Sequence, residues 1–188
     1  MRAHLTIPNI LTLFRILLVP LLVVVLLTKF ENKEFVGLGV FLLASLTDLL
    51  DGYIARRWKM ETRLGKLMDP AADKLLTAAA FVSLVELGAA PAWMVVVILS
   101  REFAVSTLRS FAAAEQVVIP AAWSGKVKTF LQVVAISLLI IYEKLGEFSH
   151  LAPLSLWAVV VVTVYSGIEY YVRYGRLVLQ PPHPPSAS

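Results

Sequence analysis

Long apolar stretches alternate with short polar segments along the whole chain. Six of these stretches are close to twenty residues long, the length that a helix needs to cross the hydrocarbon core of a bilayer. The pattern predicts helices at residues 7–29, 35–57, 68–88, 91–113, 126–144 and 152–174. We therefore expect an all-α integral membrane protein in which six transmembrane helices form one bundle.

Composition agrees with this expectation. Of the 188 residues, 59% are hydrophobic, whereas a soluble domain is usually about 45–50% apolar. The chain has no cysteine, which excludes disulfides, iron–sulfur clusters and thiolate zinc sites. We expect one membrane domain over residues 1–176 and a disordered, proline-rich tail over residues 177–188.

The basic residues are distributed unevenly around the expected helices. If the N-terminus is cytoplasmic, the three outward connections hold Lys29, Lys33 and Lys144, and the other basic residues fall towards the inner face. Positive charge is concentrated in cytoplasmic loops. The asymmetry thus predicts a multi-pass protein of the cytoplasmic membrane with both termini inside. The basic run 126–128 is too small for a nucleic-acid surface, so no nucleic-acid partner is expected.

Four aspartates interrupt the apolar pattern at the inner ends of two neighbouring helices. Asp48 and Asp51 are three residues apart, and Asp69 and Asp73 are four apart, so each pair lies on one helical face. A carboxylate near a bilayer is costly and needs a partner or a function. Two Mg²⁺ or Mn²⁺ ions would relieve the repulsion among four carboxylates and could polarise a phosphoryl group. The alternative for any one aspartate is a helix cap.

Two glycines and an arginine accompany the aspartates. Gly52 and Gly65 have no side chain, so a diphosphate could approach the backbone closely. Arg56 lies one turn beyond Gly52 and could hold a diphosphate through two parallel hydrogen bonds. Taken singly, each glycine could serve helix packing and the arginine could anchor the helix at the inner membrane face.

The whole run from Asp48 to Asp73 has the pattern D-x2-D-G-x2-A-R-x8-G-x3-D-x3-D. In this pattern the chain resembles the CDP-alcohol phosphatidyltransferases. The resemblance implies a six-helix membrane enzyme, usually a homodimer, with divalent metals and an active site facing the cytoplasm. A hydroxyl attacks the β-phosphorus of a CDP-linked lipid alcohol, and CMP leaves. The positions of the family pattern imply metal ligands at Asp48, Asp51, Asp69 and Asp73, a general base at Asp73, and nucleotide–diphosphate contacts at Gly52, Ala55, Arg56 and Gly65.

A second group of charges indicates what accepts the phosphatidyl group. Arg101 lies deep in an apolar segment, where an unpaired cation is costly, and Arg109 shares its helical face. Lys126 and Lys128 begin a helix, where the helix dipole disfavours cations. A phosphorylated polyol such as glycerol 3-phosphate would compensate all four. The alternatives are an ion pair between Arg101 and Glu102 and simple headgroup anchoring by the lysines.

Further motifs resemble the phosphatidylglycerophosphate synthase branch of the same family. They are Arg-Glu-x-x-Val-Ser-x-Leu-Arg from residue 101, Gly-Lys-x-Lys-Thr from residue 125, and Pro-Asn-x-x-Thr-x-x-Arg from residue 8. The resemblance implies CDP-diacylglycerol as donor and glycerol 3-phosphate as acceptor. Asn9 is expected to hydrogen-bond the diphosphate or to cap the first helix. Arg15 is expected to extend to the lipid headgroups, and Glu169, Tyr170 and Tyr171 to form an interfacial belt.

Two other functions remain as alternatives. The same chemistry could use another acceptor, either inositol phosphate or phosphatidylglycerol. A divalent-cation transporter could use aspartates as a pathway, but it would need acidic residues along both leaflets, and the four aspartates lie on one side. A purely structural membrane subunit would leave the clustered carboxylates without an explanation.

Overall fold

The computed structural model describes residues 7–58, 63–114 and 123–179, and within these ranges the chain forms helices and turns without a strand. The helices are α1 (Ile7–Leu27), α2 (Lys33–Trp58), α3 (Arg63–Glu86), α4 (Ala92–Ala114), α5 (Trp123–Ile140), the short 3₁₀ helices η1 (Tyr142–Lys144) and η2 (Gly146–His150), and α6 (Leu151–Leu179). The all-α fold with six long helices is therefore confirmed.

The largest differences from the expected boundaries occur at the polar ends of helices. Helix α3 begins at Arg63 rather than near residue 68, so Gly65 lies inside the helix and not in the preceding loop. Helix α6 continues through residues 177–179, which the sequence analysis assigned to the tail. Hydropathy alone cannot detect a helix that continues beyond its apolar part, because the end of the apolar stretch is the signal used. Residues 180–188 lie outside the described residues.

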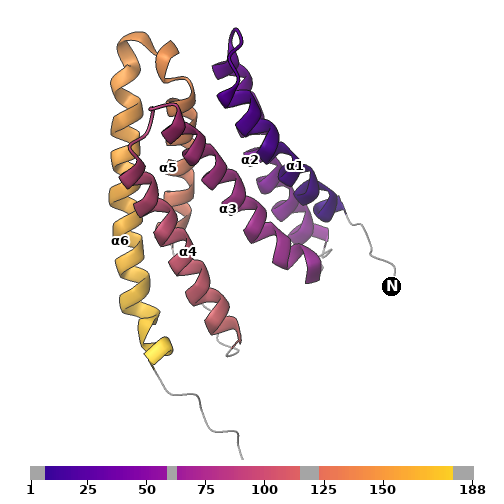
Figure 1. Cartoon of the computed structure of the whole chain (residues 1–188). Helices are drawn as coiled ribbons and strands as arrows, with labels where there is room; N and C mark the ends of the chain where they lie inside the picture. Colours follow the sequence, from indigo (N-terminus) through magenta and orange to yellow (C-terminus); the bar gives the residue numbers. More distant parts are fainter. Residues whose placement is uncertain (1–6, 59–62, 115–122, 180–188) are drawn as a thin grey trace, which may run out of the picture.

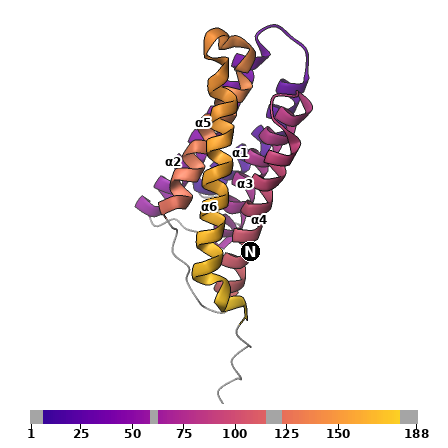
Figure 2. The same cartoon turned by 90° about the vertical axis from the view of Figure 1, so that its left-hand side faces the viewer.

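The six helices form two halves of three helices each (Figures 1 and 2). In one half α1 packs against α2 and α3, and in the other α6 packs against α4 and α5. A single cluster of buried apolar side chains, to which all six helices contribute, joins the halves. Fully buried members include Leu22, Phe41, Phe81, Ile98 and Ile136. Burial of such side chains is the main force that holds the halves together.

A tight turn reverses the chain between the two halves. Gly88 adopts a φ of 71°, a conformation that glycine reaches without steric cost. The Gly88 amide donates to the Val85 carbonyl at 2.9 Å, and the Ala89 amide donates to the Leu84 carbonyl at 2.9 Å. These bonds satisfy the last carbonyls of α3. The reversal lets residues early in α3 and residues late in α4 lie at the same end of the bundle.

Three helical segments within the described residues are long and apolar enough to cross a membrane: Pro8–Leu27, Lys33–Gly52 and Gly146–Gly175. Helices α3, α4 and α5 carry charged groups within their sequences, among them Asp69 and Asp73 of α3, Arg101 and Arg109 of α4, and Lys126 and Lys128 of α5, and charged residues lower mean hydropathy. The first and last described residues lie at the same end of the bundle (Figures 1 and 2). The crossing of a membrane by all six helices, and the cytoplasmic position of both termini, stay predictions.

Candidate active site

The four aspartates, here called the aspartate cluster, come from α2 and α3. Asp48 and Asp51 lie in the C-terminal half of α2, and Asp69 and Asp73 lie in the second and third turns of α3. Charge repulsion acts between Asp48 and each of Asp51, Asp69 and Asp73, and between Asp51 and Asp69. The two helices therefore bring all four carboxylates within electrostatic reach of one another.

Arg15 of α1 lies between the two aspartates of α2. Its side chain is 0% exposed. Its Nη2 donates a hydrogen bond to Asp51 Oδ2. Its Nη1 lies 2.7 Å from Asp48 Oδ1, an ion pair without hydrogen-bond geometry. The expectation that Arg15 extends to the lipid headgroups is wrong, because the buried Asp51 and the half-buried Asp48 provide nearer partners. The arginine neutralises charge that would otherwise destabilise the bundle.

Thr12 connects the same helix to the third aspartate. Its hydroxyl Oγ1 lies 2.6 Å from Asp69 Oδ1 and 3.0 Å from the Pro8 carbonyl oxygen. Thr12 and Arg15 are three residues apart and thus share a helical face. Asn9, a further three residues back, is buried within the first turn of α1 and not before it, so it is not an N-cap. Its expected contact with a diphosphate stays a prediction.

The donor atoms of the aspartate cluster suit a hard divalent cation. Carboxylate oxygens are the protein ligands that Mg²⁺ and Mn²⁺ prefer. Within the described ranges, no three acidic or histidine side chains already stand in a metal-binding arrangement. Two of the four carboxylates, Asp48 and Asp51, are instead paired with Arg15. The four aspartates thus supply the oxygen ligands that a divalent ion prefers. For Asp48 and Asp51 to bind the same ion, Arg15 would have to move from its position between them.

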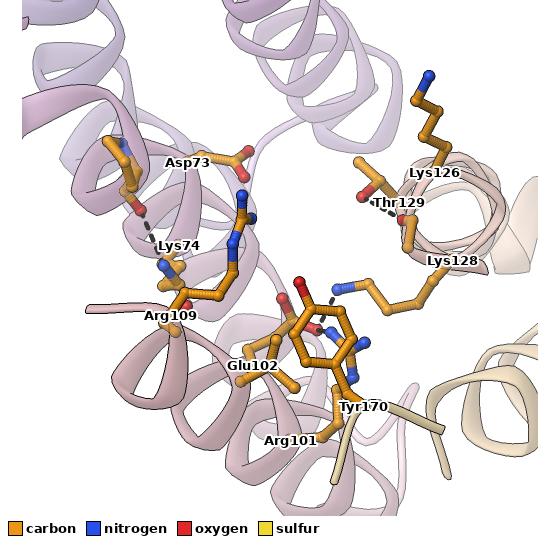
Figure 3. Close-up of a pocket in the computed structure, with 13 residues that line it drawn as sticks. Asp73, Lys74, Arg101, Glu102, Arg109, Lys126, Lys128, Thr129 and Tyr170 are labelled. Atoms are coloured by element: carbon orange, nitrogen blue, oxygen red, sulfur yellow. Dashed lines mark hydrogen bonds and ion pairs between the residues drawn. The ribbon is translucent and has the colours of Figure 1, made fainter. Parts of the chain in front are cut away.

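A cavity of about 290 Å³ opens beside the aspartate cluster (Figure 3). We call it the basic cavity. It is bordered by α3, α4, α5 and α6, and it brings together all four cations predicted to bind the acceptor phosphate. The polar and charged residues that line it are Asp73, Lys74, Arg101, Glu102, Ser106, Arg109, Lys126, Lys128, Thr129 and Tyr170.

Glu102 connects two of the four cations. Its Oε1 accepts a hydrogen bond from Lys128 Nζ and lies 3.3 Å from Arg101 Nη1. The ion pair proposed as the alternative for Arg101 is therefore present, although Arg101 also lines the basic cavity. Lys128 is buried, which makes headgroup anchoring wrong for this residue. Lys126 and Arg109 are exposed, and Lys126 extends away from Glu102 (Figure 3).

The last helix contributes residues that sequence reasoning missed. Tyr170 is 4% exposed and lines the basic cavity, so its assignment to an interfacial belt is wrong. Tyr171, the next residue, is 65% exposed, as a belt residue would be. Ser166 accepts a hydrogen bond from Arg101 at 2.5 Å. Spacing along α6 did offer a signal, because Ser166 and Tyr170 are four residues apart and share a face.

The predicted diphosphate contacts are placed less completely. Gly52 follows Asp51 in α2 and is half-buried, while Gly65 is buried in the first turn of α3. Ala55 and Arg56 belong to α2, but their side chains lie outside the described part of the structure. The role of these four residues in binding a nucleotide diphosphate stays a prediction.

Comparison with known proteins identifies close relatives. A sequence profile described as CDP-alcohol phosphatidyltransferase matches residues 5–165. A protein of Bacillus subtilis named CDP-diacylglycerol–glycerol-3-phosphate 3-phosphatidyltransferase is 41% identical over 181 residues, with 88% of this chain and 93% of that protein covered. A protein of the same name from Rickettsia felis is 37% identical over 174 residues, with 91% of this chain and 96% of that protein covered. Another from Haemophilus influenzae is 37% identical over 170 residues, with 87% of this chain and 90% of that protein covered.

Proposed function

Since the chain belongs to the CDP-alcohol phosphatidyltransferase family, we propose that it transfers a phosphatidyl group from CDP-diacylglycerol to glycerol 3-phosphate. The products are phosphatidylglycerol phosphate and CMP. Relatives whose names carry this activity cover most of the chain. The proposal concerns the acceptor, the metal dependence and the roles of individual residues.

One observation carries the proposal: Asp73 borders the same cavity as the four cations. A phosphate held by Arg101 and Lys128 would place the hydroxyl groups of a short polyol within the cavity, beside the Asp73 carboxylate. An oriented pair of reactants reacts far faster than a free pair, because the loss of translational freedom has already occurred on binding. A neutral or cationic acceptor would leave the basic residues without an anionic partner.

Asp48, Asp51, Asp69 and Asp73 would hold the divalent ions. When bound, such ions neutralise the diphosphate and make CMP a better leaving group. Before an ion binds, Thr12 holds Asp69 and Arg15 holds Asp48 and Asp51, because each contacts these carboxylates directly. Arg56, Gly52, Ala55, Gly65 and Asn9 are the proposed contacts of the nucleotide and its diphosphate.

The proton of the acceptor hydroxyl passes to Asp73, which acts as general base. The acceptor oxygen forms a bond to the β-phosphorus of CDP-diacylglycerol, and the bond from that phosphorus to the bridging oxygen breaks. The bridging oxygen leaves with CMP, so no covalent intermediate with the protein is needed. Arg101 and Lys128 hold the acceptor phosphate throughout.

The membrane arrangement follows from the lipid donor. The acyl chains of CDP-diacylglycerol would lie in the bilayer while its cytidine diphosphate reaches the aspartate cluster. We place both sites at the cytoplasmic face of the inner membrane, with all six long helices crossing it, because the basic residues are concentrated at that end. A homodimer is part of the proposal through the family resemblance alone.

An acceptor panel tests the proposal. Purified protein is incubated with CDP-diacylglycerol, Mg²⁺ or Mn²⁺ and one acceptor at a time, and CMP release is measured. We expect release with glycerol 3-phosphate and loss of release when EDTA removes the metal. Release with inositol phosphate or phosphatidylglycerol but not with glycerol 3-phosphate would overturn the acceptor assignment. Metal flux into proteoliposomes that lack CDP-diacylglycerol would instead favour the transporter alternative.

A further inference from the structure

Helix α6 contacts Arg101 at two adjacent residues. Arg101 Nη2 donates to Ser166 Oγ at 2.5 Å, and Ser166 is completely buried. At Gly167 an added Cβ would stand 3.1 Å from Arg101 Cγ, closer than ordinary van der Waals contact. Ser166 thus holds the guanidinium of Arg101, and Gly167 leaves room for the aliphatic part of the same Arg101 side chain.

These contacts fix an otherwise mobile group. A free arginine side chain has many rotamers and loses that conformational entropy when it binds a ligand. Glu102 contacts Nη1 of Arg101 and Ser166 accepts from Nη2, so both terminal nitrogens are positioned before any ligand arrives. Prior orientation of a binding group increases affinity because less entropy is lost on binding.

Ser166 differs from the other serines of the long helices that have a described hydrogen bond. The hydroxyls of Ser45, Ser137 and Ser155 donate to backbone carbonyls three or four residues earlier in their own helices, which is the usual arrangement for a helical serine. Ser166 accepts a hydrogen bond from a side chain 65 positions away, on another helix. This contact therefore serves tertiary structure, and it is directed at a residue that lines the basic cavity.

We propose that Ser166 and Gly167 of α6 are positioning residues that hold the Arg101 guanidinium for the phosphate of the acceptor. The inference rests on the proposed function, since it presumes a phosphate-bearing acceptor in the basic cavity. It gives the last helix a role in acceptor affinity, acting through Arg101 and not through direct contact with the substrate.

Steady-state kinetics of Ser166→Ala provide the first test. A hydrogen bond to a charged group is worth roughly 1.5–3 kcal/mol, so the KM for glycerol 3-phosphate should rise by about tenfold or more. We expect kcat and the KM for CDP-diacylglycerol to change by less than about twofold, because Arg101 acts on the acceptor. Ser155→Ala in the same helix is the matched control and should leave all three parameters unchanged.

The glycine provides a second, independent variant. Gly167→Ala should displace Arg101 and raise the same KM, whereas Gly39→Ala, where nothing lies within 4 Å of the added Cβ, should not. Both substitutions place alanine in a helix, so any effect of helix propensity is shared between them. A rise in the KM for CDP-diacylglycerol with either Ser166→Ala or Gly167→Ala would overturn the inference.

A double-mutant cycle separates positioning from general packing. In Arg101→Lys the side chain lacks Nη2, so Ser166→Ala should then add less than about twofold to the KM. Multiplicative effects would mean that Ser166 acts independently of Arg101, which contradicts the inference.

Calorimetry separates failure of this inference from failure of the proposed function. Binding of inorganic phosphate to the purified protein, without CDP-diacylglycerol, should weaken in both Ser166→Ala and Gly167→Ala. If the acceptor panel rejects glycerol 3-phosphate, the proposed function fails, but weaker phosphate binding would still support the role of α6. Equal phosphate affinity in wild type and both variants would overturn that role while leaving the acceptor panel unaffected.

Discussion

The aspartate cluster and the four cations of the basic cavity lie side by side, and in each group one residue of the opposite sign contacts two of the like charges. In the aspartate cluster, Arg15 of α1 contacts Asp48 and Asp51. In the basic cavity, Glu102 of α4 contacts Arg101 and Lys128. Two of the four carboxylates and two of the four cations thus share one internal counterion each.

The difference between the regions lies in what the counterion must do when a ligand binds. Arg15 is completely buried between two carboxylates that would have to converge on a cation, so a bound metal and Arg15 compete for the same oxygens. Glu102 shares only one oxygen with its two cations, and Arg101 and Lys128, which both line the cavity, have more donor hydrogens than that oxygen can accept. We infer that metal binding displaces its counterion, whereas acceptor binding adds to an arrangement already in place.

Asp73 is the point at which the two regions meet, so its substitution tests the comparison most severely. It repels Asp48 and is attracted by Lys128. We expect Asp73→Asn to lower kcat by about 10²–10⁴-fold, the usual contribution of a general base, while CDP-diacylglycerol still binds. CMP release measures the first effect and lipid binding the second. Glu86→Gln, at the exposed far end of α3, is the control, and retained turnover in Asp73→Asn would remove Asp73 as the base.

Removal of Arg15 tests the acidic side. Arg15→Met keeps an unbranched side chain but removes the cation that pairs with the buried Asp51 and the half-buried Asp48, so the metal-free protein should lose about 3–5 kcal/mol of stability. Mn²⁺ should then raise the Tm of the variant more than that of the wild type, because it replaces the missing charge. Thermal unfolding with and without MnCl₂ measures both effects.

The control for Arg15 is Arg173→Met, which breaks an exposed ion pair with Glu169 and should change stability by less than about 1 kcal/mol. A smaller Mn²⁺-induced shift in Arg15→Met than in the wild type would show that Arg15 assists metal binding, and the proposed competition would then be wrong.

Removal of the Glu102 charge tests the basic side and should have the smallest effect. Glu102→Gln keeps the shape but weakens the contacts to Arg101 and Lys128, at a cost of roughly 1–3 kcal/mol. Inorganic phosphate should stabilise this variant more than it stabilises the wild type. The stabilising ligand is here an anion, whereas the ligand that stabilises Arg15→Met is the cation Mn²⁺. Thermal unfolding with and without phosphate measures the difference. The control is Glu34→Gln, which affects the ion pair of Glu34 with Lys144 in η1. An equal phosphate-induced change in Tm for Glu102→Gln and the wild type would contradict the prediction.

Much of this arrangement was predictable because it depends on spacing along single helices. Hydropathy located the six long helices, and the three- and four-residue intervals placed the aspartates in pairs. The basic residues of α4 and α5 were expected to share a ligand, and the structure places them around one cavity. In each of these examples the relevant distance follows from helical periodicity, which a sequence contains directly.

Partners on distant helices were not predictable in the same way. Arg15 and Asp51 are 36 residues apart, and Arg101 and Ser166 are 65 apart. A lone arginine in an apolar helix indicates that a partner exists, but only the packing of α1 and α6 on their neighbours identifies which residue it is. Tyr170 was misassigned because the sequence does not show which face of α6 the other helices cover.

The turn at Gly88 has a consequence for the evolution of the enzyme. It is the sole link along the chain between the carboxylates of α3 and the guanidinium groups of α4. One inserted residue there would rotate α4 by about 100° about its axis if the rest of the turn were unchanged, and Arg101 would then face away from Asp73. Length variation among homologues should therefore be rare at this turn and commoner in the connection between α5 and α6, which only joins segments at the end of the bundle remote from both sites.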